Sequence, residues 1–292
     1  MIVDYFNFWH ILGVFLSICS YICLYFLLRK RKEKTKKIVL FSFLFFALLL
    51  HFLKVYIPPY SLDQNRLYND IWFINICAAN ILIFPFIFIS KSKGAKDYMF
   101  YIGLLSGLIS IFYPMEPILK GEQQAAELLD VIRFYIHHTI LWVVPLLMVT
   151  LKLHKITYKG SIWAPTGLLL LMLFIILNQV FQEELGFIVR RTNDFLLIKF
   201  KNTSYIWGPD DNIGYFIANF TPDIFKIVPV GSHAGEVKYW PWFWLIVPAY
   251  ILITPISFGI SLLFDWKNFK FDILHNIHNV TLSVNNKHKG ED

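Results

Sequence analysis

A cysteine and a histidine in separate apolar segments are the residues of this chain best suited to chemistry. Cys77 and His138 both lie inside apolar runs, where a polar side chain is costly unless it is paired or faces water. A thiol near a neutral imidazole can transfer its proton to that ring, and the thiolate then attacks an ester carbonyl. The pair would form an acyl-thioester, with His138 first protonating the leaving alcohol and then deprotonating the acceptor. These two residues therefore indicate acyl transfer that requires no cofactor.

Other polar residues inside the apolar runs are candidates to support this pair. They are His51, Asn75, His137, Asn178 and Gln179. The amide of Asn75 or Asn178 could donate a hydrogen bond to the oxyanion. His137 and His138 are neighbours on a helix and point about 100° apart, so only one of them can face a given partner. For His51, a hydrogen bond to a neighbouring helix and a role in the site are equally open.

Simpler roles for the same residues remain open. Packing is the alternative for Cys77, and it is the role we expect for the other two cysteines. A metal site is a further alternative, with ligands from His51, His138, and Glu183 or Glu184. The chain has no metal-ligand spacing such as H-E-x-x-H, so we expect no metal.

The elements that must hold these residues are membrane helices. The chain is 57% hydrophobic and 16% charged, whereas soluble proteins are about 45–50% hydrophobic and about 25% charged. The apolar residues occur in runs of about twenty, enough for an α-helix to cross roughly 30 Å of hydrocarbon. We therefore predict an all-α, polytopic membrane protein whose transmembrane domain occupies residues 1–264, with close helix packing at Gly103 and Gly107. Its seven predicted spans cover residues 7–28, 38–57, 71–89, 98–113, 132–151, 161–181 and 240–264.

The positive charges predict how these helices are oriented. The formal net charge is +7, and Lys and Arg gather after the first, third, fifth and seventh spans. Cytoplasmic loops of membrane proteins are enriched in Lys and Arg, so we predict an outer N-terminus and an inner C-terminus. This explains the basic residues without a nucleic-acid partner, and it predicts a multi-pass protein of the cell membrane.

Two segments outside the spans have patterns of their own. In the predicted external loop, residues 182–239, the β-like stretches Phe195–Phe200 and Tyr215–Ala218 flank a turn signal at Gly208–Asn212. That pattern predicts a small hairpin cap before the last helix. In residues 265–292, apolar side chains at every third or fourth position predict a cytoplasmic amphipathic helix in the membrane interface.

The predicted spans place the candidate residues at one depth. Cys77 is about six positions inside the third span and His138 about six inside the fifth, which corresponds to roughly 9 Å below the outer boundary. His51 and Asn178 also lie near the outer ends of their spans. The ester groups of glycerophospholipids lie at this depth, so we expect a membrane phospholipid as acyl donor.

Four short motifs resemble the YwaF-like family of integral membrane proteins. They are Asn75-Ile76-Cys77, Gly103-Leu104-Leu105-Ser106-Gly107, Phe134-Tyr135-Ile136-His137-His138 and Trp240-Pro241-Trp242-Phe243. Animal relatives of this family are described as cysteine-dependent acyltransferases that act on ether phospholipids. The resemblance implies that Cys77 is the nucleophile and His138 its histidine, with no catalytic role for His137. Many bacterial members have a histidine at the position of Asn75, which leaves the role of that residue open.

The leading hypothesis is an acyltransferase that passes a fatty acyl group from a phospholipid, through a Cys77 thioester, to a lysolipid or lipoprotein acceptor. A lipid hydrolase would use the same two residues with water as the acceptor. A non-catalytic transporter or receptor would also have membrane helices with a polar outer layer. Against a transporter, no Asp or Glu lies within any predicted span, so a proton relay would need histidines alone.

Overall fold

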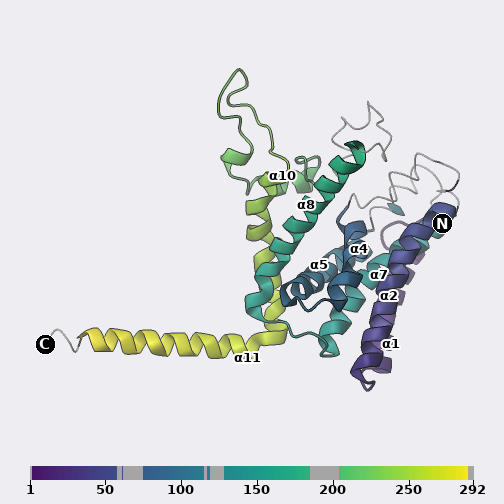
Figure 1. Cartoon of the computed structure of the whole chain (residues 1–292), viewed down its shortest axis with the longest axis horizontal. Coiled ribbons are helices and arrows are strands. Elements are labelled where there is room, and N and C mark those ends of the chain that lie inside the picture. Colours follow the sequence, from purple (N-terminus) through teal and green to yellow (C-terminus); the bar gives the residue numbers. More distant parts are fainter. Residues whose placement is uncertain are drawn as a thin grey trace.

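Long helices form the framework of the molecule (Figure 1). The computed structural model describes residues 2–57, 61, 75–114, 117–118, 128–184 and 204–288. The long helices are α1 (Phe8–Leu28), α2 (Glu33–Leu53), α4 (Ile76–Ile89), α5 (Lys93–Phe112), α7 (Leu128–Thr150), α8 (Trp163–Glu184) and α11 (Ile246–His288). The shorter ones are η1 (Lys54–Tyr56), η3 (Tyr158–Ile162), α10 (Asn212–Ala218), η4 (Asp223–Phe225) and η5 (Phe243–Leu245). No named strand occurs among the described residues, and the predicted all-α class is confirmed.

Six of the described helices are long and apolar enough to cross a membrane. The helix in the predicted third span, α4, has only 14 residues. At about 1.5 Å per residue it measures about 21 Å, against roughly 30 Å for the hydrocarbon core. The residues that would complete this span, 71–74, lie outside the described part of the chain. The count of seven crossings therefore stays a prediction.

Polar caps decide where the helices begin. The Ser92 hydroxyl accepts a hydrogen bond from the Ala95 backbone N–H (3.2 Å), so α5 starts at Lys93 rather than at residue 98. Such a cap satisfies a backbone donor that has no partner within the helix. Lys93 and Lys96 therefore stand on α5 and not in a loop. Helix α7 is described from Leu128, ahead of the predicted start at residue 132.

The centre of the bundle is the packing of α5 against α7. Gly103 lies against the carbonyl oxygen of Leu141 and the ring of Pro145. Gly107 lies against the carbonyl oxygen of His138. A Cβ atom at either glycine would come within 3.0 Å of its neighbours, so glycine is what allows the two backbones to approach this closely. Rising residue numbers on α5 meet falling numbers on α7, and the two helices are therefore antiparallel.

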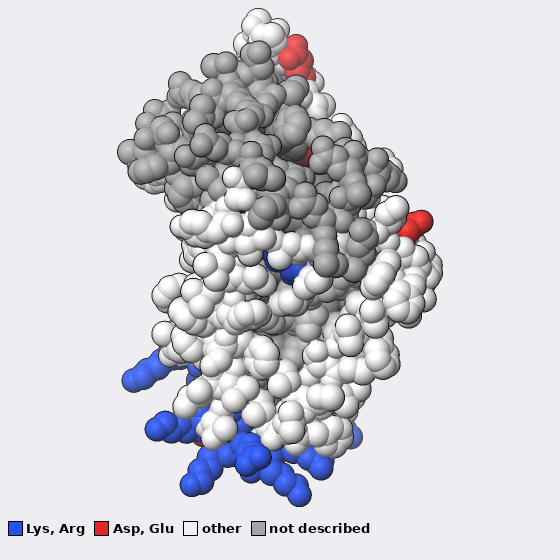
Figure 2. All heavy atoms as spheres, turned by 90° about the vertical axis from the view of Figure 1, so that its right-hand side faces the viewer, with Lys and Arg blue, Asp and Glu red and all other residues white. Residues whose placement is uncertain are grey.

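The basic connections meet at one end of the bundle. Lys36, near the start of α2, donates to the carbonyl oxygen of Leu151 after α7 (3.4 Å). Gly160 in η3 lies against Asp97, near the start of α5. Figure 2 shows Lys and Arg gathered at one end of a largely apolar face. Basic segments that follow every second span must lie at the same end of the bundle, and the structure agrees with this. The orientation in the membrane stays a prediction.

The predicted hairpin cap is wrong in its second stretch. Tyr215–Ala218 belongs to α10, which Asp211 caps by accepting a hydrogen bond from the Gly214 N–H (2.7 Å). The turn signal contains Asp211, and an Asp in that position is a good helix N-cap, so the chain continues as a helix from Asn212. The described part of the loop has one isolated antiparallel bridge, between Ile227 and Val237. Phe195–Phe200 lies outside the described residues.

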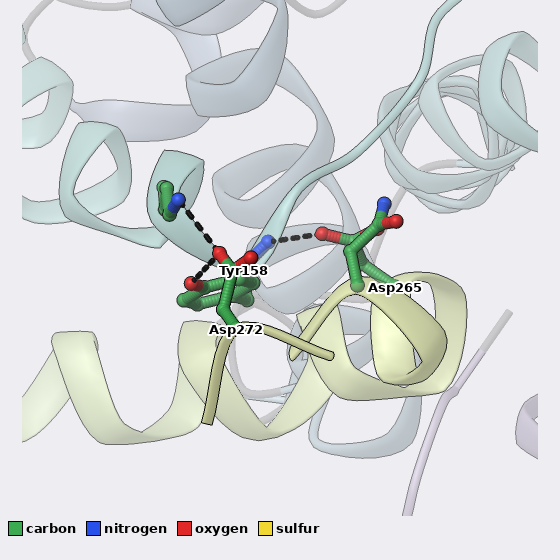
Figure 3. A network of polar contacts seen from close by, with 5 residues as sticks. Tyr158, Asp265 and Asp272 are labelled. Carbon is green, nitrogen blue, oxygen red and sulfur yellow. Dashed lines mark hydrogen bonds and ion pairs between the residues drawn. The ribbon is translucent and has the colours of Figure 1, made fainter. Parts of the chain in front are cut away.

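Helix α11 bends where the predicted tail begins. Asp265 has φ −129° and ψ 20°, and beyond it the helix runs away from the bundle (Figure 1). Asp265 accepts a hydrogen bond from the Tyr158 N–H (3.1 Å), and Asp272 accepts one from the Tyr158 hydroxyl (2.6 Å). Lys159 forms an ion pair with Asp272 (2.7 Å). These contacts hold the bend against η3 (Figure 3), and the place of the tail in the membrane interface stays a prediction.

A pair of glycine substitutions tests the packing of α5. Gly103→Ala should lower the free energy of unfolding by about 1–3 kcal/mol, because the added methyl group forces α5 and α7 apart. Gly259→Ala, in α11, places the same methyl group where no atom lies within 4 Å. It should leave stability unchanged or raise it by up to about 1 kcal/mol, since Ala is the better helix former. Thermal unfolding in detergent measures both, and equal stabilities would contradict this packing.

Candidate functional site

Cys77 stands in the first turn of α4. Asn75 is the N-cap of this helix, and its side chain accepts a hydrogen bond from the Ala78 N–H (2.8 Å). The N-terminus of a helix carries a partial positive charge, which favours an anion such as a thiolate. Cys77 is partly buried and packs against the apolar core. The local sequence therefore places the thiol at a helix N-terminus, against the apolar core.

His138 has a defined orientation on α7. Its Nδ1 lies 2.8 Å from the carbonyl oxygen of Phe134, and its ring packs on the Phe134 ring at 4.2 Å between centroids. A carbonyl oxygen only accepts hydrogen bonds, so Nδ1 must carry the proton. In the neutral ring, Nε2 is then an acceptor, which is the form that a general base requires.

The packing around Gly103 brings together the helices that carry Cys77 and His138. The Phe84 ring of α4 and Leu141 of α7 both lie against this glycine. Cys77 precedes Phe84 by seven residues, and His138 precedes Leu141 by three. Because α4 also packs against α7, the thiol and the imidazole lie on two packed helices.

His137 faces a different partner from His138. Its ring lies 6.2 Å from the ring of His51 on α2, between centroids, and both side chains are 2% exposed. Arg133 and Lys54 lie close enough to interact with His137 electrostatically. Lys54 is also 2% exposed. The structure thus brings the two histidines into a buried cationic cluster where α2 packs on α7.

Sequence analysis did not include Lys54 and Arg133 in the site. Both lie close to an end of a predicted span, where long basic side chains ordinarily extend to the headgroup region. The buried position of Lys54 follows from the packing of η1 and α2, which no local pattern specifies. Figure 2 shows Lys or Arg atoms inside a recess of the apolar face, well away from the basic end.

A buried hydrogen bond beside Cys77 involves a tyrosine that sequence analysis missed. The Tyr98 hydroxyl donates to Asn80 Oδ1 (2.6 Å), and the two residues are 3% and 0% exposed. Cys77 interacts electrostatically with the same hydroxyl. With Oδ1 thus engaged, Asn80 Nδ2 is a buried donor that has no acceptor among the described residues. Asn80 follows Cys77 by three positions and so shares its helix face.

The remaining predicted residues have other environments. The Asn75 side-chain oxygen is used as the cap of α4. Gln179 is buried and accepts a hydrogen bond from Trp207 Nε1 (3.4 Å), which ties α8 to the segment before α10. Asn178 is partly buried on α8, a helix that packs against α4, α5 and α11. The side chains of Glu183 and Glu184, needed for the metal alternative, lie outside the described part.

A large apolar cavity lies along the opposite face of α7. Its volume is about 700 Å³, and it is lined by residues of α1, α2 and α7. Ile132, Ile136 and Thr139 contribute to it, whereas Cys77, His137 and His138 do not. This cavity therefore does not border the thiol and imidazoles.

A double-mutant cycle tests the Asn80–Tyr98 bond. Tyr98→Phe and Asn80→Leu each leave one buried polar partner unpaired, which costs about 1–3 kcal/mol. The double variant should be less destabilised than the sum of the two, with a coupling energy of about 1 kcal/mol, as for other hydrogen bonds between membrane helices. Thermal unfolding of the four proteins in detergent measures this coupling. Strict additivity would show that the two side chains do not interact.

Comparison with known proteins identifies the family. Residues 5–261 match the model of the TMEM164 family. No curated protein and no solved structure matches the chain. The match covers the helices from α1 to the first part of α11, including every candidate residue described above. The chain therefore belongs to the TMEM164 family of membrane proteins.

Proposed function

We propose that this protein is an acyltransferase of the cell membrane, which moves a fatty acyl group from a glycerophospholipid to a lysolipid or lipidated acceptor. The observation that carries the proposal is His138, a histidine of defined tautomer on a helix that packs against the helix bearing Cys77. The likeness of four motifs to YwaF-like proteins supports the same assignment. The family match by itself extends only to a membrane protein.

The reaction divides into two balanced halves. In the first, the Cys77 proton passes to His138 Nε2, and the thiolate attacks the ester carbonyl carbon of the donor. The carbon–oxygen ester bond breaks, and the leaving alkoxide takes the proton from His138. In the second half, His138 accepts the proton of the acceptor hydroxyl, which attacks the thioester carbon. The carbon–sulfur bond breaks, and the departing thiolate takes the proton from His138, which restores the thiol and the neutral imidazole.

The oxyanion of each half-reaction needs a preorganised donor. Asn80 fits this role, because Tyr98 engages Oδ1 and leaves Nδ2 as a buried donor one turn from Cys77. Donors held in place before the reaction stabilise the developing charge without reorganisation. Asn75, one of the two amides favoured from sequence, acts here as the helix cap.

The buried cationic cluster suits a phospholipid donor. Lys54, Arg133 and His51 surround His137 where α2 meets α7. A phosphate that bears a negative charge is attracted to such a group. This supports a glycerophospholipid over an uncharged ester as the donor.

Replacing Cys77 tests the nucleophile. Purified protein in liposomes, supplied with a phospholipid carrying a labelled acyl chain and an unlabelled lysolipid, should produce labelled diacyl product. Cys77→Ala should reduce this product to background, because no thioester can form. Intact-mass analysis of the native chain should detect one acyl group, released by hydroxylamine and absent from Cys77→Ala. Cys19→Ala is the matched control and should retain both signals.

Substitution of each histidine in turn distinguishes the general base from its neighbour. His138→Gln should lower transfer by about 10²–10⁴-fold, the usual contribution of a general base, whereas His137→Gln should retain most activity. Full transfer by Cys77→Ala, or loss of transfer in His137→Gln alone, would refute the assignment. Free labelled fatty acid in place of labelled diacyl product would identify a hydrolase with the same residues.

A pair of variants compares Asn80 with Asn178 as the donor to the oxyanion. Asn80→Leu should lower the turnover of the acyl-transfer reaction by about 10²–10³-fold, the usual cost of one lost oxyanion donor. Asn178→Leu is the matched variant on α8 and should have little effect. Size-exclusion profiles in detergent establish that both variants are folded. Selective loss of turnover in Asn178→Leu would move the oxyanion donor to α8.

A further inference from the structure

A second cavity lies at the basic end of the bundle. Its volume is about 360 Å³, and it lies between the start of α5 and the connection from α7 to α8. The charged and aromatic side chains that line it are Lys93, Asp97, His154, Lys155, Lys159 and Trp163. Asp97 is near the start of α5, whereas Gly107, which packs on His138, is near its other end. The cavity and His138 therefore lie toward different ends of α5.

One wall of the cavity is a buried hydrogen-bonded pair. His154 Nε2 lies 2.7 Å from Asp97 Oδ1, and each side chain is 8% exposed. Gly160 packs so closely on Asp97 that a Cβ atom there would overlap the carboxylate. A carboxylate held between an imidazole and the backbone has little freedom to turn toward a ligand. The lysines are then the dominant charges of the cavity.

Three ammonium groups give the cavity a positive potential. Lys93, on the first turn of α5, and Lys155, on the connection, are both exposed. Lys159 also lines the cavity, and its Nζ is 2.7 Å from Asp272 at the base of the tail helix. Several cations around one concave space favour a ligand that carries negative charge and accepts many hydrogen bonds, and phosphate has both properties.

The surroundings of the cavity are typical of sites where membrane proteins bind lipid headgroups. Trp163 is 45% exposed at the start of α8, and its ring packs on Gly94 of α5. Trp residues concentrate at the level of the headgroups, where one part of the ring is apolar and another is polar. Basic clusters at the ends of membrane helices attract anionic lipids. The cavity thus opens where phosphate groups of a bilayer are available.

We propose that this cavity binds a phosphate group, presented by the headgroup of an anionic phospholipid or as free phosphate. The site does not depend on Cys77 or His138. Lys93 and Lys155 contact the phosphate, and Lys159 links the site to the tail helix through Asp272.

Two double variants with the same net charge test this site. Lys93→Gln/Lys155→Gln removes two charges from the cavity, and Lys91→Gln/Lys152→Gln removes two exposed lysines from the same end that do not line it. Delipidated full-length protein in detergent is titrated with dioleoyl phosphatidic acid and followed by native mass spectrometry. The cavity variant should bind it about 25-fold more weakly than the native chain, since each lysine near a membrane contributes about fivefold. The control variant should bind close to normally.

Two further probes identify the source of the phosphate. Dioleoylglycerol has the same chains without phosphate and should not bind in the same titration. Inorganic phosphate is titrated separately, by isothermal calorimetry. Binding of phosphatidic acid alone assigns a lipid headgroup, and binding of inorganic phosphate with the same dependence on Lys93 and Lys155 assigns a free anion. Equal weakening by both double variants, or no binding of either phosphate probe to the native chain, would overturn the proposal.

Discussion

The close approach of α5 and α7 is the constraint on which the rest of the bundle depends. In lipid, helices gain little from the hydrophobic effect, so their association relies on close packing and on hydrogen bonds. Gly103 and Gly107 allow the two backbones to approach closely, and the Phe84 ring of α4 packs against Gly103. This one contact places α4, which carries Cys77, beside α7, which carries His138.

Buried polar groups complete the packing by pairing with one another. Ser17 of α1 accepts hydrogen bonds from Thr139 and Trp142 of α7, and Asn80 of α4 accepts one from Tyr98 of α5. In an apolar medium an unpaired polar group costs several kcal/mol, so these pairs specify which helix faces meet. Where α2 packs on α7, His51, His137 and Lys54 are all buried, and ionisable groups buried together in this way are typical of functional sites.

The two ends of the bundle differ in character. At the basic end, the α7–α8 connection holds the bend of α11 through Tyr158 and Lys159, and it borders the cavity with the Asp97–His154 pair. Near the start of α4, polar residues of α2, α4 and α7 lie within the apolar part of the bundle. The two regions adjoin on α5, which contributes Tyr98 to one and Asp97 to the other.

The sequence by itself determined the all-helical class, most helix positions, the segregation of basic loops and the close packing at Gly103 and Gly107. Each follows from a local pattern: a run of apolar residues, a cluster of charges, or small residues four apart. It placed Tyr215–Ala218 in a strand, because an Asp that ends a turn and an Asp that caps a helix look alike in sequence. Only the tertiary structure decided that His137 faces His51, that His138 has its Nδ1 occupied, that Lys54 is buried and that Tyr98 serves Asn80. These depend on how whole helices rotate and pack against one another, and that is a property of the assembled bundle rather than of any single segment.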